Sequence, residues 1–228
     1  MPTLLAIDTC STKCKVALLH QGSVSLREGN ELQKTAQNIL VLIDDLLTEA
    51  GLVYNQLDAL AVVTGPGSFT GVRIGVAITQ GLSLSSSTPV VAISSLAILA
   101  SAASQKFDGD LFLSCMKARE NEVYFGVYQC TGDDVRLIGS EQVNATGAVS
   151  SQELAGERLR IFIGIGDGWI YREQLEKSLS LELTHCVNDN FSSMEDVCRL
   201  AAARYRKGDV VKDEQVLPNY VKEQMDYS

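Results

Sequence analysis

Short apolar runs alternate with amphipathic segments along the first hundred residues. Runs of apolar residues, or strict apolar–polar alternation, predict five strands, at residues 3–9, 13–20, 23–28, 57–64 and 89–93. Helical spacing predicts three helices, at residues 32–50, 71–86 and 94–103. The order is three strands followed by alternating helices and strands, which predicts an α/β lobe built on a mixed five-stranded sheet.

The same order begins again after a polar stretch at residues 104–109. Further strands are predicted at residues 110–116, 122–129, 135–142, 159–163 and 183–187. Further helices are predicted at residues 150–155, 170–179 and 194–206. This recurrence indicates an internal duplication. We expect a first lobe at 1–104 and a reduced second lobe at 105–228, with the last residues able to return to the first lobe.

The most distinctive stretch is GPGSFTGVRIG, from Gly65 to Gly75, which separates a strand from a helix. It does not match a P-loop, because five residues separate Gly65 from Gly71 and no Lys-Ser/Thr follows. It lacks the flanking glycines of a nucleophile elbow around Ser68, and Thr70 occupies the third glycine position of a dinucleotide fingerprint. The spacing favours a tight turn with small-residue packing, capped by Ser68 or Thr70.

The helix after this loop has one formal charge, Arg73, and no clearly polar face. Such a helix is usually covered on more than one side, and a second subunit is one candidate cover. Arg73 is expected to pair with an acidic group of a partner or with a neighbouring loop. Gly71 and Gly75 would permit close approach of a partner backbone. The preceding helix has a widened apolar arc at Leu42, for which an interface and a single exposed leucine are equal alternatives. The candidate interface residues are Leu42, Leu46, Val72, Arg73, Val76 and Gln80. A Val76→Glu change is expected to abolish partner binding while the monomer stays folded.

Charge and cysteine content narrow the function further. A formal net charge of −9 argues against unaided nucleic-acid binding. The six cysteines are scattered, with two histidines elsewhere, His20 and His185. We therefore expect reduced thiols, no metal site and a cytoplasmic protein. No leader sequence or membrane span is predicted.

Asp8 ends the first strand and is followed by hydroxyl side chains at Thr9 and Ser11. A carboxylate there could hold Mg²⁺ and nucleotide phosphate, or Asp8 could form an Asx turn. A second glycine turn at 164–169 carries its third glycine one residue too early for a dinucleotide site.

Several motifs together resemble the TsaB (YeaZ) family. They are residues 6–9, reading AIDT; the Gly65–Gly75 run; Ala118-Arg119 followed by Glu122-Val123-Tyr124; and Pro218 with Tyr220. The resemblance covers nearly the whole chain. It implies two ribonuclease-H-like lobes of the actin/sugar kinase/Hsp70 superfamily. It also implies a role, with TsaC, TsaD and TsaE, in placing threonylcarbamoyl on adenosine 37 of ANN-decoding tRNAs. Lys117 stands where relatives commonly have Asp.

The resemblance also implies a non-catalytic subunit. TsaD carries a His-x-x-x-His metal pair, and the matching positions here are Ser95 and Leu99, neither of which replaces imidazole as a metal ligand. Asp8, Thr9 and Ser11 would then be a vestigial nucleotide site, and ATP or ADP with Mg²⁺ at a subunit junction is the one cofactor considered. The expected partners are TsaD in a heterodimer and TsaE, with a homodimer when the chain is alone. Contact with tRNA is expected only through the complex. A metal-dependent glycoprotease-like enzyme and a nucleotide-binding regulator remain the alternatives.

Overall fold

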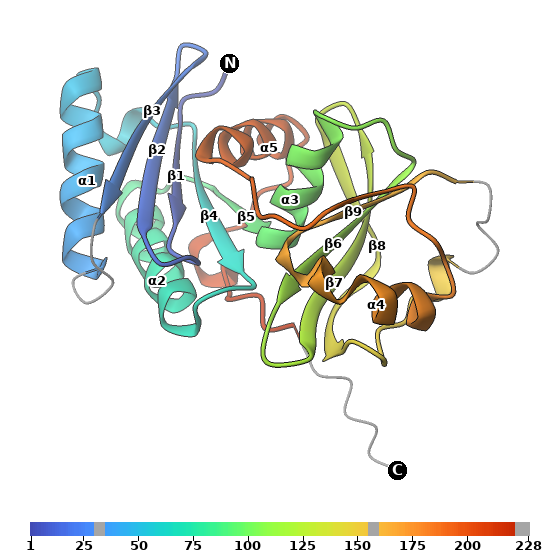
Figure 1. Ribbon diagram of the computed structural model, residues 1–228. Coiled ribbons are helices and arrows are strands. Elements are labelled where there is room, and N and C mark those ends of the chain that lie inside the picture. The colour runs from blue at the N-terminus through green and yellow to red at the C-terminus, as the bar shows by residue number, and fades with distance from the viewer. Residues whose placement is uncertain (30–34, 155–159, 222–228) are drawn as a thin grey trace. The chain divides into compact units, whose positions relative to one another are not determined.

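The computed structural model describes residues 1–29, 35–154 and 160–221, and the chain forms two compact units (Figure 1). Unit 1 comprises Met1–Ser95 and Ser193–Asn219, and unit 2 comprises Leu96–Ser192 together with Tyr220. The boundary differs from the expected one at residue 104, because nearly all of helix α3 (Ser95–Ser104) belongs to unit 2. A segment near the end of the chain that includes helix α5 (Met194–Arg206) belongs to unit 1, a return that the expected division allowed for.

Unit 1 contains a five-stranded mixed sheet, as predicted. Its strands are β1 (Leu4–Asp8), β2 (Cys14–His20), β3 (Ser23–Gly29), β4 (Ala59–Gly65) and β5 (Val90–Ser94). They lie in the order β3-β2-β1-β4-β5. β1 pairs antiparallel with β2 and parallel with β4, and β5 pairs parallel with β4. β1 and β4 run parallel and end at the same edge of the sheet, so Asp8 at the end of β1 lies close to Gly65, the first residue of the glycine loop.

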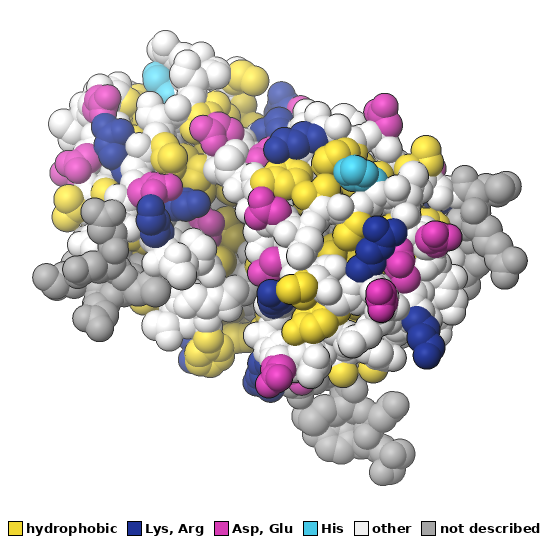
Figure 2. Space-filling view, viewed as in Figure 1, with side chains coloured by type: hydrophobic (Ala, Val, Ile, Leu, Met, Phe, Trp, Pro, Cys, Tyr) yellow, Lys and Arg dark blue, Asp and Glu magenta, His cyan; other side chains and the backbone are white. Residues whose placement is uncertain are grey.

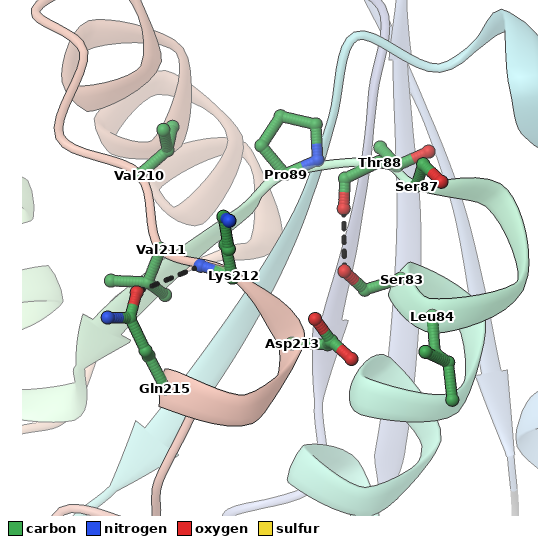
Figure 3. Close-up of a pocket in the computed structure, with 10 residues that line it drawn as sticks. All are labelled: Ser83, Leu84, Ser87, Thr88, Pro89, Val210, Val211, Lys212, Asp213 and Gln215. Atoms are coloured by element: carbon green, nitrogen blue, oxygen red, sulfur yellow. Dashed lines mark hydrogen bonds between the residues drawn. The ribbon is translucent and has the colours of Figure 1, made fainter.

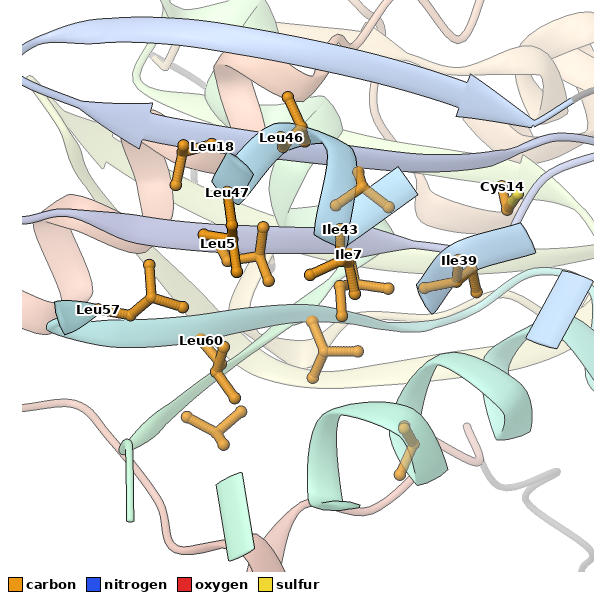
Figure 4. Close-up of a cluster of buried hydrophobic side chains, with 14 of the residues drawn as sticks. Leu5, Ile7, Cys14, Leu18, Ile39, Ile43, Leu46, Leu47, Leu57 and Leu60 are labelled. Atoms are coloured by element: carbon orange, nitrogen blue, oxygen red, sulfur yellow. The ribbon is translucent and has the colours of Figure 1, made fainter. Parts of the chain in front are cut away.

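Helices α1 (Thr35–Ala50) and α2 (Phe69–Ser86) pack against this sheet and against each other. Side chains point to alternate faces along a strand, so Leu5 and Ile7 of β1 face the helices. They join the buried cluster drawn in Figure 4, in which α1 contributes the stripe predicted from its sequence. The residues of that stripe in the cluster are Ile39, Ile43, Leu46 and Leu47. The predicted start of α1, at residues 32–34, lies outside the described residues.

Helix α5 (Met194–Arg206) contacts β1, β2, β4 and β5, and Figure 1 shows it on the other side of the sheet from α1. Its buried alanines, Ala201–Ala203, have small side chains, which allows the helix to pack closely on the sheet. Ser193 caps the helix by accepting a hydrogen bond from Asp196 N at 3.3 Å. This packing explains why the end of the chain belongs to unit 1, about a hundred residues after the rest of that unit.

Unit 2 repeats the sheet topology of unit 1. Its strands are β6 (Leu111–Lys117), β7 (Glu122–Thr131), β8 (Asp134–Ala145), β9 (Phe162–Ile165) and β10 (His185–Val187). They lie in the order β10-β9-β6-β7-β8. Read from the other end, this is the order of unit 1, with β6 to β10 in the places of β1 to β5. The predicted duplication is therefore confirmed at the level of topology, and the α/β fold class with it.

The helices of unit 2 are short. Helix α3 (Ser95–Ser104) is tied to β6, whose Ser114 Oγ donates to Leu96 O at 2.8 Å. The predicted helix at 150–155 is a 3₁₀ turn, η3 (Gln152–Leu154), and the helix predicted at 170–179 is η4 (Asp167–Tyr171) followed by α4 (Arg172–Leu179). Two further 3₁₀ turns belong to unit 1, η2 (Tyr54–Gln56) and η5 (Asp213–Gln215). None of the helices in the described parts of the chain has the length and apolarity needed to cross a membrane.

Candidate functional site

The glycine loop is fastened to the turn that follows β1. Ser68 N donates to Cys10 O at 2.8 Å, and Ser68 Oγ accepts from Gly71 N at 3.2 Å. Ser68 is therefore the N-cap of α2, which was one of the two predicted caps. Gly65 has a φ of +99°, a conformation that L side chains rarely adopt, so the strand leaves the sheet at a position that needs glycine.

Three glycines of the motif allow α2 and its loop to approach β1 and the turn after it. A Cβ at Gly67 would lie 2.5 Å from Cys10 O. A Cβ at Gly71 would overlap Thr9 O, and one at Gly75 would overlap Thr9 Oγ1. Thr9 Oγ1 also donates to Gly71 O at 2.6 Å. The close approach that we expected between Gly71, Gly75 and a partner helix is instead made within unit 1, to Thr9.

The three residues of the expected nucleotide site have different surroundings. Asp8 Oδ1 accepts from Cys10 N at 2.8 Å, which is the contact of an Asx turn. Burial raises the pKa of the Asp8 carboxyl, and the hydrogen bond from Cys10 and the charge of Lys15 offset this only in part. Thr9 is buried against Gly71, and Ser11 Oγ donates to Lys13 O at 3.1 Å. The contacts thus match the Asx interpretation, and nucleotide binding by Asp8, Thr9 and Ser11 stays a prediction.

Cys10 lies beside Asp8 and contacts the end of β4, where its Sγ donates to Val63 O at 3.3 Å. Burial, together with the neighbouring Asp8 carboxylate, raises the pKa of this thiol well above its usual range. A thiol held protonated is a poor nucleophile and a poor metal ligand. Cys10 therefore acts as a packing residue of the loop.

Ser95 and Leu99 are one turn apart at the start of α3. Ser95 Oγ is buried beside the Cys10 thiol, and Leu99 is buried as well. A hydroxyl and an alkyl side chain do not bind a transition metal as a pair of imidazoles does. Among the described residues, no group of three or more His, Cys, Asp or Glu side chains is arranged to hold a metal ion.

The second glycine turn, at 164–169, closes on β6. A Cβ at Gly166 would overlap Cys115 O, and one at Gly168 would lie 2.5 Å from Cys115 Sγ. The Asp167 carboxylate accepts from Lys117 N at 2.9 Å. The glycines are thus explained by strand packing, and the backbone of Lys117 is held by this turn.

The structure corrects three of the six expected interface residues. Leu46, Val72 and Val76 are 1%, 6% and 4% exposed and belong to the core of unit 1. Their side chains offer a partner almost no contact area, because they face the sheet. A helical wheel without a polar face could not distinguish the sheet-facing side from the outward side. A glutamate at position 76 would place its carboxylate in the core of unit 1, so we expect Val76→Glu to destabilise the monomer rather than leave it folded.

The other three positions differ from one another. Leu42 is half-buried and packs against the same core, and Gln80 Nε2 donates to Val216 O at 2.8 Å within unit 1. Arg73 is exposed, and its guanidinium lies 3.7 Å from the centre of the Phe69 ring. This cation–π contact with its own helix is worth roughly 0.5–1 kcal/mol at an exposed site. It favours the intrachain alternative for Arg73.

The outward surface of the two helices is uncharged along much of α2. We call the following exposed residues the α1–α2 face: Leu40, Val41, Arg73, Ala77 and Gly81. Leu40 and Val41 are 48% and 59% exposed, and the exposed Asp44 and Asp45 follow them one turn later on α1. Figure 2 shows basic and acidic side chains interspersed over the visible surface, with no extended basic patch.

Comparison with known proteins gives a consistent result. The model of the family described as TsaD, tRNA N6-adenosine threonylcarbamoyltransferase, matches residues 32–214. The tRNA threonylcarbamoyladenosine biosynthesis protein TsaB of Escherichia coli (strain K12) is 34% identical over 96% of this chain and 94% of its own length. The solved structure of YeaZ from Pseudomonas aeruginosa superposes with a TM-score of 0.80 at 37% identity, covering 96% of this chain and all of that one.

The match to a threonylcarbamoyltransferase itself is much shorter. The tRNA N6-adenosine threonylcarbamoyltransferase of Kosmotoga olearia is 36% identical over 64 residues, which are 28% of this chain and 19% of that protein. The match to the TsaB relative thus extends over nearly the whole of both chains, whereas the match to this transferase spans 64 residues.

Proposed function

Because the chain belongs to the TsaB proteins, and also to the wider family described as TsaD, we propose that it is a non-catalytic subunit in the biosynthesis of threonylcarbamoyladenosine in tRNA. In this role it binds and supports the threonylcarbamoyltransferase TsaD, with TsaE as a further partner. It contacts tRNA only through the assembled complex. Without TsaD, the same surface pairs two copies of the chain.

One observation carries this proposal, the full-length match to a TsaB protein against the partial match to a transferase. The residues at the candidate site support it. Ser95 and Leu99 supply no metal ligand. The Cys10 thiol is held protonated beside Asp8, and Thr9 is used in packing the loop. The sheet edge at the ends of β1 and β4 is therefore built to hold α2 in place.

The proposed partner surface is the α1–α2 face. The loop contacts fix α2 against β1, so the face is presented on a rigid support. A specific protein complex buries roughly 800 Å² on each partner, an area that two helices lying side by side can supply. Exposed apolar residues on α1 and small ones on α2 suit a partner helix whose contact surface is also largely apolar, with charged groups that face Arg73 of α2 and the exposed Asp44 and Asp45 of α1.

An Ala77→Glu variant tests this surface. Ala77 is exposed on α2, so the added carboxylate should leave the fold intact and place an unpaired charge in the contact. We expect TsaD to bind at least tenfold more weakly, measured by calorimetric titration, at a cost of about 1.4 kcal/mol or more. Ala148→Glu is the matched control, the same change at an exposed alanine of unit 2. Equal affinity of the two variants would remove Ala77 from the interface.

Reconstitution tests the function itself. TsaC, TsaD, TsaE, ATP, threonine, bicarbonate and unmodified tRNA are combined with and without this chain, and the modified nucleoside is measured by mass spectrometry. We expect formation of the modified base to depend on the chain, and no transfer when TsaD is omitted. Transfer by the chain without TsaD would contradict a non-catalytic role.

A further inference from the structure

A pocket of about 680 Å³ opens in unit 1 between the end of α2 and the segment that carries η5. Figure 3 shows the side chains that line it. They are Ser83, Leu84, Ser87, Thr88, Pro89, Val210, Val211, Lys212, Asp213 and Gln215. The volume falls within the roughly 300–1,000 Å³ of small-molecule sites. None of these residues belongs to the α1–α2 face, so this pocket is separate from the proposed partner surface.

The walls of the pocket are held by hydrogen bonds. Val90 and Val211 exchange backbone bonds of 3.0 and 2.8 Å, which fix the 210–212 segment to β5. Ser83 Oγ donates to Thr88 O at 2.7 Å, which ties the end of α2 to the next strand. Gln80 Nε2 holds the far end of η5 through Val216 O at 2.8 Å. The pocket is therefore largely formed before any ligand enters.

Two opposite charges line the pocket without forming ion pairs. Within the described parts of the chain, neither the Lys212 ammonium nor the Asp213 carboxylate takes part in a salt bridge, and they do not pair with each other. Asp213 is half-buried and Lys212 is exposed. In Figure 3 the two side chains diverge, Lys212 toward Pro89 and Asp213 toward Ser83 and Leu84.

The surroundings of the two charges define a ligand. Pro89, Val211 and Leu84 add apolar surface to the pocket, with Pro89 and Val211 on the side of Lys212 and Leu84 on the side of Asp213 (Figure 3). Helix α2 ends at Ser86, and the partial negative charge of a helix C-terminus adds to that of Asp213 in favouring a cation on that side. We propose that this pocket binds a small zwitterion in which an apolar carbon chain separates an ammonium group from a carboxylate. The carboxylate pairs with Lys212, the ammonium with Asp213, and the methylene groups cover Pro89 and Val211. This inference goes beyond the proposed function and does not depend on it.

Titration of the full chain with 6-aminohexanoate, followed by ¹⁵N NMR, tests the proposal. We expect saturable shifts confined to residues 83–89 and 210–215. Hexanoate and hexylamine each lack one charge and are expected to bind about fivefold more weakly. Absence of saturable shifts up to about 50 mM 6-aminohexanoate, or equal binding of all three compounds, would overturn the proposal.

Variants assign each charge to its partner. Lys212→Met should reduce the affinity for 6-aminohexanoate to that for hexylamine, and Asp213→Asn should reduce it to that for hexanoate. Lys212 is exposed and Asp213 is half-buried, and a thermal melt of each variant checks that the fold is intact. Lys177→Met and Asp189→Asn, at exposed sites of unit 2, are the matched controls and should change nothing. Unchanged affinity in both pocket variants would show that the charges do not contact the ligand, and the proposal would fall.

Discussion

Replacing Gly71 by Ala should destabilise unit 1, although alanine is the better helix former. In an exposed helix interior, Gly→Ala stabilises by roughly 1 kcal/mol. At Gly71 the added methyl would overlap the backbone oxygen of Thr9, far inside the 3.0 Å limit below which real Cβ atoms are essentially never found. A backbone atom cannot move aside by changing rotamer, so the helix and the β1–β2 turn must separate.

The size of the effect follows from the contacts that would be disturbed. Overpacking in a rigid site costs roughly 1–3 kcal/mol, and the rigid neighbour here argues for the upper end. Displacing α2 also loses the hydrogen bond from Thr9 Oγ1 to Gly71 O, worth about 1 kcal/mol. The gain in helix propensity offsets about 1 kcal/mol of this total. We expect a net loss of about 3 kcal/mol.

The assay is urea denaturation followed by far-UV circular dichroism, with a thermal melt beside it. For a chain of this size the loss corresponds to a fall in Tm of roughly 6–12 °C. Gly81→Ala is the matched control, since Gly81 lies on the same helix with no atom within 4 Å of an added Cβ. It should stabilise by roughly 1 kcal/mol. If Gly71→Ala proved as stable as Gly81→Ala, the role assigned to the motif's glycines would be refuted.

Three substitutions test the same region. Val76→Glu should lower the free energy of unfolding by roughly 3 kcal/mol or more, because it buries an unpaired carboxyl, whereas the neighbouring Ala77→Glu should stay within about 0.5 kcal/mol of the parent in urea denaturation. Asp8→Asn should stabilise unit 1 at pH 7. Burial raises the pKa of the Asp8 carboxyl in the folded chain above the 3.8 of an unperturbed carboxyl. The folding stability of the parent therefore falls as the pH rises from the unfolded-state pKa to the folded-state pKa. A tenfold difference in proton affinity between the folded and unfolded chain corresponds to about 1.4 kcal/mol. The variant's advantage should disappear below about pH 4, and an advantage that persisted at low pH would exclude this cause.

Local sequence patterns predicted the strands, the long helices and the duplication, because each follows from the residue period of an element with one or both faces buried. The motifs carried the resemblance to the TsaB family without any structure. The sequence also limited the chemistry, since Ser95 and Leu99 have no imidazole to offer a metal.

Only the tertiary structure shows which face of each helix packs on the sheet and which face is exposed to a partner. Leu46, Val72 and Val76 have the same residue types as surface leucines and valines, and only the position of the sheet shows that they lie in the core. The same holds for Gly71, whose neighbour Thr9 is distant in sequence, and for α5, which joins a sheet formed from the first half of the chain. The spacing of apolar residues along the sequence predicts that a side chain is buried. Which segment covers that side chain depends on contacts between residues that are far apart in the sequence.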